Sequence, residues 1–141
     1  MSSKVVHDKI MTYLTANWTT TPIFDFDNYL RDADLPLTPW IGIQFMASRE
    51  GVVSLTGTST TGYREIGIFF IHAIIPNGFD MVSAVTMCED LRNLFRGKRI
   101  DDTIVIIKAN PPTQDNGIAL NIKGNWVGWA VVIEYYSDFF Y

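Results

Sequence analysis

The chain has 141 residues, a formal net charge of −4 and 48% hydrophobic residues, which is the range of one globular domain. The acidic balance argues against the broad basic surface that sequence-independent DNA binding uses. The longest nearly apolar run, Ile66 to Ile75, is about half of what a membrane helix needs, so no membrane contact is expected.

The N-terminal segment predicts an amphipathic helix. One of the first serines can cap it, and it runs to about Asn17 with one apolar face, formed by Val6, Ile10, Tyr13 and Leu14. Three threonines and Pro22 end this helix, because the residue before a proline is disfavoured in helical backbone. A short strand is expected over 23–26, and a charged surface loop with prolines over 28–39.

Two predicted strands flank a stretch rich in glycine, serine and threonine. Residues 40–47 alternate as a half-buried strand does. Residues 63–75 are almost all β-branched or aromatic and become apolar on both parities, which predicts a central strand with both faces covered. Between the two strands, residues 48–62 interleave glycines with hydroxyl side chains. They predict a long hairpin tip or a mobile, flexible loop.

A turn and a second helix follow the central strand. Pro76-Asn77-Gly78 ends the strand, and Asp80 can cap a helix whose apolar side chains recur every three or four residues over 81–95. Gly97 suits a left-handed C-cap. Cys88 is the only cysteine and lies on the apolar stripe, so it is predicted to be a buried, inert thiol.

Three further strands are predicted after the second helix. A polar connection over 98–102 precedes a β-branched strand over 103–109, which Asn110-Pro111-Pro112 ends. A short strand is expected over 118–122 between two turn signals, and the last strand over 126–136.

This order of elements predicts an α+β fold in a single domain that covers residues 1–141. The sheet is expected to be mixed, mainly antiparallel and of about five strands, with two helices packed on one face. The other face of the central strand then has no obvious cover within the chain. We therefore expect another subunit to cover it.

The sequence offers no catalytic or metal-binding constellation. His7, His72 and Cys88 fall in three separate elements without paired spacing, so neither a zinc site nor a cofactor is expected. His72 lies in mid-strand and predicts a structural imidazole rather than a general base. No P-loop, dinucleotide fingerprint or Gly-x-Ser-x-Gly elbow occurs. The chain is thus predicted not to be an enzyme; a monomeric ligand-binding module is a weaker alternative.

Two groups of side chains are candidates for partner binding. The first is a basic cluster that is either a solvated helix end or a docking patch for an acidic partner, formed by Arg92, Arg96, Lys98 and Arg99. The second is aromatic and either folds into the chain's own core or anchors on a neighbouring subunit: Phe139, Phe140 and Tyr141.

Several short motifs follow one another over nearly the whole chain. They are Asn17-Trp18, Thr21-Pro22-Ile23, Pro39-Trp40-Ile41-Gly42-Ile43, Arg64 with Gly67, Pro76-Asn77-Gly78, Leu91 with Phe95, Pro111-Pro112, and Trp126. In this order and spacing the chain resembles the tail terminators of tailed bacteriophages. These are minor tail proteins that cap the tail tube.

The resemblance implies a structural virion protein at the head-proximal end of the tail, assembled in the cytoplasm of the bacterial host. Such proteins form a hexameric ring that binds the last ring of tail-tube protein, stops polymerisation and presents a surface to the head connector or neck protein. DNA passes through the ring without stable binding, which an acidic chain suits. A head-closure or neck protein, or another minor tail protein on a related fold, is the alternative.

Within that role, sheet edges and the C-terminal aromatic residues are expected to join subunits. The loop from Arg49 to Tyr63 is expected to contact the tube or to line the channel. The candidate partner-binding residues are therefore Arg49, Val52, Val53, Leu55, Tyr63, Arg96, Lys98, Arg99, Phe139, Phe140 and Tyr141.

Overall fold

The computed structural model describes residues 4–25, 38–55, 61–76, 81–114 and 126–140. They form α1 (Lys4–Asn17), β1 (Ile23–Asp25), β2 (Trp40–Leu55), β3 (Thr61–Pro76), α2 (Met81–Phe95), β4 (Arg99–Ile100), β5 (Ile104–Ala109), β6 (Thr113–Gln114) and β7 (Trp126–Phe140). The predicted α+β class is confirmed. The strand expected over 118–122 lies outside the described residues. Of the loop expected over 28–39, only residues 38 and 39 are described.

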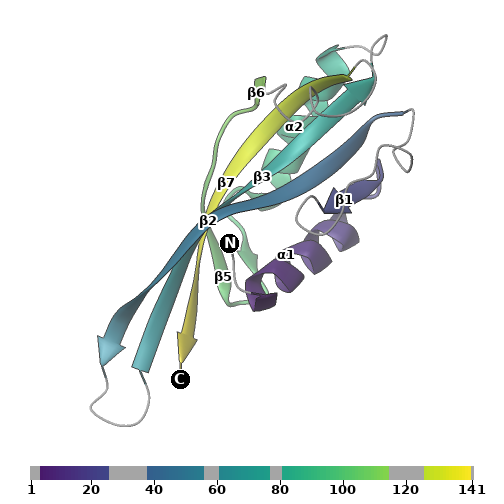
Figure 1. The fold of residues 1–141 in the computed structure, drawn as a ribbon. Helices are drawn as coiled ribbons and strands as arrows, with labels where there is room; N and C mark the ends of the chain where they lie inside the picture. The colour runs from purple at the N-terminus through teal and green to yellow at the C-terminus, as the bar shows by residue number, and fades with distance from the viewer. Residues whose placement is uncertain (1–3, 26–37, 56–60, 77–80, 115–125, 141) are drawn as a thin grey trace.

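The seven strands among the described residues form one sheet, in the order β1-β2-β3-β7-β5-β4, with β6 also paired to β7. The β1–β2 pair is parallel and the other pairs are antiparallel, so the predicted mixed, mainly antiparallel sheet is confirmed. Figure 1 shows β2, β3 and β7 running almost the whole length of the molecule as one twisted sheet.

Two strands that were not predicted, β4 and β6, are only two residues long. Alternation cannot be recognised over so few residues. The expected polar connection over 98–102 contains β4 because Asp101 and Asp102 adopt positive φ values of 51° and 55°, which turn the chain back onto β5. Aspartate tolerates this left-handed backbone better than most residues.

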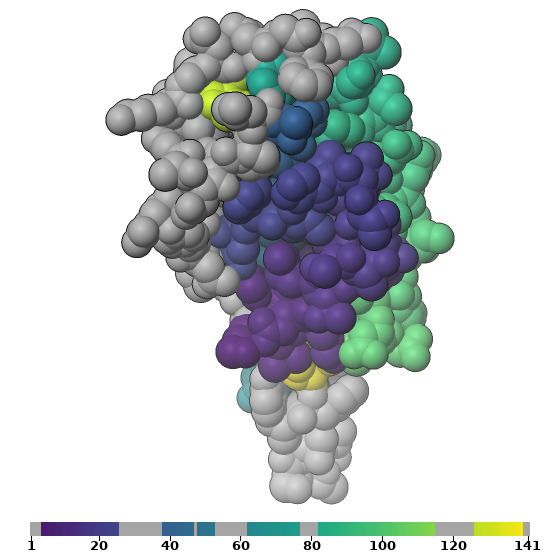
Figure 2. Space-filling view, turned by 90° about the vertical axis from the view of Figure 1, so that its right-hand side faces the viewer, coloured from purple at the N-terminus to yellow at the C-terminus, as the bar shows by residue number. Residues whose placement is uncertain are grey.

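Both helices lie on the same face of the sheet, as predicted. α1 buries Val6, Ile10 and Leu14. α2 ends at Phe95, and Gly97 follows with a φ of +68°, which confirms the left-handed C-cap. In Figure 2, α1 lies across this face with the chain from α2 to β5 beside it. The helices and the sheet share one buried core, which includes Phe69, Ile71, Leu91, Phe95, Ile133 and Tyr135.

The stretch over 48–62 forms a hairpin and is far less of a loop than expected. β2 continues to Leu55 and β3 begins at Thr61, so only residues 56–60 lie between them and outside the described residues. A register shift between Phe45 and Ser48 lets β2 carry on along β3. The valines and threonines of this stretch favour extended backbone, which the glycines obscured in the sequence.

Candidate binding surface: an arm and an open sheet face

Three strands continue together beyond the helices. We call this part the arm; it consists of residues 48–55 of β2, 61–67 of β3 and 137–140 of β7. Figure 1 shows it projecting away from both helices, with the end of β7 beside the β2–β3 hairpin. β7 was expected to end near residue 136 and instead pairs with β3 as far as Phe140. Residues 137–140 are therefore a strand of the arm.

A cross-strand ion pair joins β3 to β7 within the arm. Arg64 donates from Nε to Asp138 Oδ1 (2.8 Å) and from Nη2 to Asp138 Oδ2 (3.0 Å). The guanidinium also lies 4.0 Å from the centroid of the Tyr136 ring. The hydrogen bonds from Arg64 lower the pKa of the Asp138 carboxyl, although its partial burial opposes them. This planar, two-bond contact joins two residues that lie directly opposite each other on the two strands.

A buried tyrosine marks the root of the arm. The hydroxyl of Tyr135 donates to Glu65 Oε2 (2.8 Å), and Glu65 is only 6% exposed. The Tyr135 ring lies directly over Gly67, where an added Cβ would be 2.3 Å from the hydroxyl oxygen. Gly67 therefore allows this close approach, which gives a physical reason for one of the motif residues.

The sheet face opposite the helices carries a group of apolar side chains in its lower half, nearer the arm, where Glu134 lies in register with Ile68. Ile66, Ile68, Phe70 and Val132 are half-buried there, and Met46 is 41% exposed. We call these five residues the open face. One face of the central strand was expected to have no cover within the chain. The open face fits this expectation, because both helices pack on the other side of the sheet.

The upper half of the same face, farther from the arm, is covered by the chain itself, contrary to that expectation. Trp40, His72 and Ile74 are buried, and the Trp40 ring packs edge-on against the rings of Phe24 and Trp126 at 5.1 Å and 6.1 Å. His72 Nε2 donates to Gln44 Oε1 (3.1 Å), in line with the structural role predicted for this imidazole. Among the described residues of this face, the expected lack of cover is thus limited to the half nearer the arm.

The predicted partner-binding residues divide between the arm and the end of α2. Arg49 and Val52 are exposed on the arm, where Val52 is 54% exposed. Tyr63 is half-buried and lies in register with Val52 on one side and Phe139 on the other. Phe139 packs partly against the chain's own core. The remaining candidates have no described side chain: Val53, Leu55, Phe140 and Tyr141.

The basic cluster does not act as one group. Arg92 donates from Nε to the carbonyl oxygen of Ala109 (2.9 Å) and so holds α2 against β5. Arg96, Lys98 and Arg99 are exposed. Sheet register connects Arg99 through Val105 to Tyr136, so these three cations lie on the β7 side of the arm's root.

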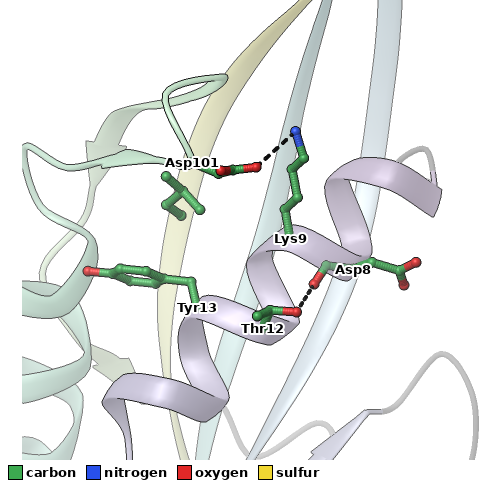
Figure 3. A pocket seen from close by; sticks show the side chains of 6 residues that line it. Asp8, Lys9, Thr12, Tyr13 and Asp101 are labelled. Carbon is green, nitrogen blue, oxygen red and sulfur yellow. Dashed lines mark hydrogen bonds and ion pairs between the residues drawn. The ribbon is translucent and has the colours of Figure 1, made fainter.

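A groove of about 490 Å³ lies between α1 and the β4–β5 turn (Figure 3). Its polar groups already bind one another. Lys9 Nζ lies 3.2 Å from Asp101 Oδ2 and donates to Thr103 Oγ1 (2.9 Å), while the Tyr13 hydroxyl donates to the Leu94 carbonyl (2.5 Å). This groove therefore lacks the convergent unpaired groups that mark a small-molecule site.

The candidate metal-ligating and nucleophilic residues are used in packing. His7 Nε2 lies 2.7 Å from Asp25 Oδ2 and connects α1 to β1. Cys88 is buried, as predicted, and burial raises the pKa of its thiol to about 12. Within the described ranges, no group of three or more His, Cys, Asp or Glu residues is placed to hold a metal. None of the described helices is long and apolar enough to cross a membrane.

Sequence reasoning missed the contacts that shape the arm. Arg64 and Asp138 are 74 positions apart, and Glu65 and Tyr135 are 70 apart. Neither pair can be recognised without knowing that β3 pairs with β7. The one available signal was the aromatic content of residues 135–140, because Tyr and Phe are enriched in strands and would have extended the last strand.

Comparison with known proteins identifies a fold and no family. No family model matches this chain, and no curated protein matches it. A solved structure, whose name says nothing of its function, is similar to it with a TM-score of 0.58 and 15% sequence identity, over 100% of this chain and 98% of the other. At this identity the similarity concerns the fold alone.

Proposed function

We propose that this chain is a structural virion protein that works as a tail terminator: it forms a ring on the end of the tail tube and stops its polymerisation. The observation that carries the proposal is the three-stranded arm, which projects beyond the helix-covered body and exposes four consecutive residues of β2, Arg49 to Val52. The order and spacing of the sequence motifs supply the family resemblance. The arm supplies a surface suited to assembly.

The open face supports a subunit contact. Half-buried Ile66, Ile68 and Phe70 form an apolar strip on the side of the sheet that carries neither helix. Covering such a strip gains roughly 25 cal/mol for each Å² of apolar surface removed from water. In the ring that we propose, the neighbouring copy covers it.

The charge of the chain supports a conduit for DNA. The net charge of −4 weakens adhesion to phosphate, which a channel that DNA must traverse requires. On the arm, Asp138 neutralises the charge of Arg64, whereas Arg49 is exposed. The other surface of the ring would receive the head connector or neck protein.

The test mixes the chain with the tube protein of its phage during polymerisation and measures tube lengths by electron microscopy. A terminator shortens the tubes and adds density at one end. Unchanged lengths without end density contradict the proposal and favour the head-closure alternative. In phage that lack the gene, the two roles also separate: loss of a terminator gives overlong tubes, whereas loss of a closure protein gives normal tails that fail to join heads.

A further inference from the structure

Two strand edges of the arm adjoin no other strand among the described residues. β1 pairs with β2 only over Ile41–Ile43, so nothing described flanks the outer edge of β2 at 49–52. β5 pairs with β7 only as far as Ser137, and β7 continues to Phe140 without it. The backbone groups on such edges are ready templates for a further strand.

We propose that the β2 edge of one copy pairs with the β7 edge of the next copy, so that the arms of a ring close into one β-barrel with three strands from each copy. This inference rests on the proposed ring and names the contact that holds it together. The occupant of each edge is thus a second copy of this chain.

The direction of the strands defines the geometry of this contact. β2 and β7 are both antiparallel to β3, so both run from the body toward the tip of the arm. Copies related by rotation about a ring axis keep all arms pointing the same way. The contact between β2 of one copy and β7 of the next is therefore parallel, unlike the antiparallel pairs within each arm.

The position of the two edges favours a second copy over an unrelated strand. Gly51 pairs with Arg64, and Arg64 pairs with Asp138, so the two edges lie at the same level of the arm. Identical copies can then satisfy both edges at once in a head-to-tail contact that closes on itself. A strand from another protein would cover one edge and leave the other open.

The size of the resulting barrel suits a conduit. The resemblance implies six copies, which would contribute about 18 strands, and barrels of that size enclose an aqueous channel. The exposed cations Arg96, Lys98 and Arg99 lie on the β7 side, where the neighbouring copy would approach. Because each copy carries a net charge of −4, they would attract it.

Cysteine cross-linking tests the proposal. In the double variant Gly51→Cys/Asp138→Cys, β3 separates the two positions within a copy by about 10 Å, which is too far for a disulfide. Any bridge must therefore join two copies. An added Cβ at Gly51 meets nothing within 4 Å. Cys88 is buried and does not compete. A second pair, Arg49→Cys/Asp138→Cys, allows for a shifted register on the same face.

We expect oxidation of a double variant to give a ladder of covalent multimers up to the ring size, in concentrated protein or on tube ends. Each single variant should give no covalent multimers. Dimers from Gly51→Cys alone would show like edges pairing and would overturn the proposal. So would the absence of a ladder from both pairs in protein that still shortens tubes. A ladder without shortened tubes would support the pairing and contradict the terminator role. Val82→Cys/Asp138→Cys is the matched control, since Val82 is 68% exposed on α2.

Replacing Asp138 removes its ion pair with Arg64, so a second variant leaves that pair intact. Val52→Lys places a charge on the open edge of β2, and Val82→Lys places the same charge on α2. We expect Val52→Lys to reduce ring formation and capping at least tenfold, while Val82→Lys leaves both unchanged. Equal behaviour of the two folded variants would contradict edge pairing.

Discussion

The body and the arm use the same three strands in different ways. In the body, β3 lies under both helices and buries Phe69, Ile71 and Ala73 completely. In the arm, the same strand has no helix above it, and its order depends on neighbouring strands and on contacts such as Arg64–Asp138. The body is thus stabilised by burial. The arm exposes edges that a second copy can use.

Changes in the body should have the largest effect on stability. Phe69 is fully buried and packs against the rings of Phe45, Phe95 and Tyr135. Phe69→Ala removes these contacts and leaves a cavity, which we expect to lower the free energy of unfolding by about 3–5 kcal/mol. Urea denaturation followed by circular dichroism measures the change. A loss below about 1 kcal/mol would show that this part of the body is not the core.

The root of the arm should be the next most sensitive site. In Gly67→Ala the new methyl group overlaps the Tyr135 hydroxyl, so the ring must move from its place beside Glu65. We expect a loss of about 1–3 kcal/mol in the same denaturation experiment. Gly51→Ala is the matched control on the arm, because its Cβ meets nothing. Equal losses for the two variants would contradict the close approach of Tyr135.

The ion pair of the arm should respond to acid. Arg64 lowers the pKa of Asp138 below its usual 3.8, so the folded chain gains stability above that pH and loses it as the pH falls through the lowered pKa. Because both groups are partly exposed, we expect a small effect. Asp138→Asn should remove this part of the acid dependence of the melting temperature. An identical profile for the parent chain and the variant would contradict the contribution of the ion pair.

The thiol of the body should be inert. Burial, with a smaller effect of Glu89, raises the pKa of Cys88 from 9.0 to about 12, so the folded state retains a neutral thiol and loses stability as the pH rises above 9.0. We expect iodoacetamide to modify the native chain at least tenfold more slowly than the unfolded chain at about pH 8.5. Mass spectrometry measures both rates. Equal rates would contradict the burial of Cys88 between α2 and the sheet.

The sequence predicted the body better than the arm, for a physical reason. The helices over 4–17 and 81–95 follow from local periodicity and capping, and Gly97 marks the end of the second. The hairpin over 48–62 combines glycines with β-branched residues, so its local preference is divided, and pairing with β3 decides its structure. The same holds for the end of β7, whose partner lies more than 70 positions earlier.

The candidate surface was predicted in part. Arg49, Val52 and Tyr63 are brought together on the arm, near Phe139. The cations at 96, 98 and 99 lie beside its root and not on it. The sequence could not predict that the chain covers the sheet face around Trp40, because Phe24 and Trp126 pack on Trp40 from distant parts of the chain.

The central claim is that the arm, and not the body, carries the assembly function. Deleting Val52 to Thr61 joins Gly51 to Gly62 and leaves a two-residue turn between Gly51 and Arg64, which pair in the parent chain. We expect the variant to keep the melting temperature of the body while tubes polymerised in its presence grow as long as tubes without it. If the folded deletion variant shortens tubes as well as the parent chain does, residues 52–61 are not part of the assembly surface, which contradicts a role for the outer part of the arm.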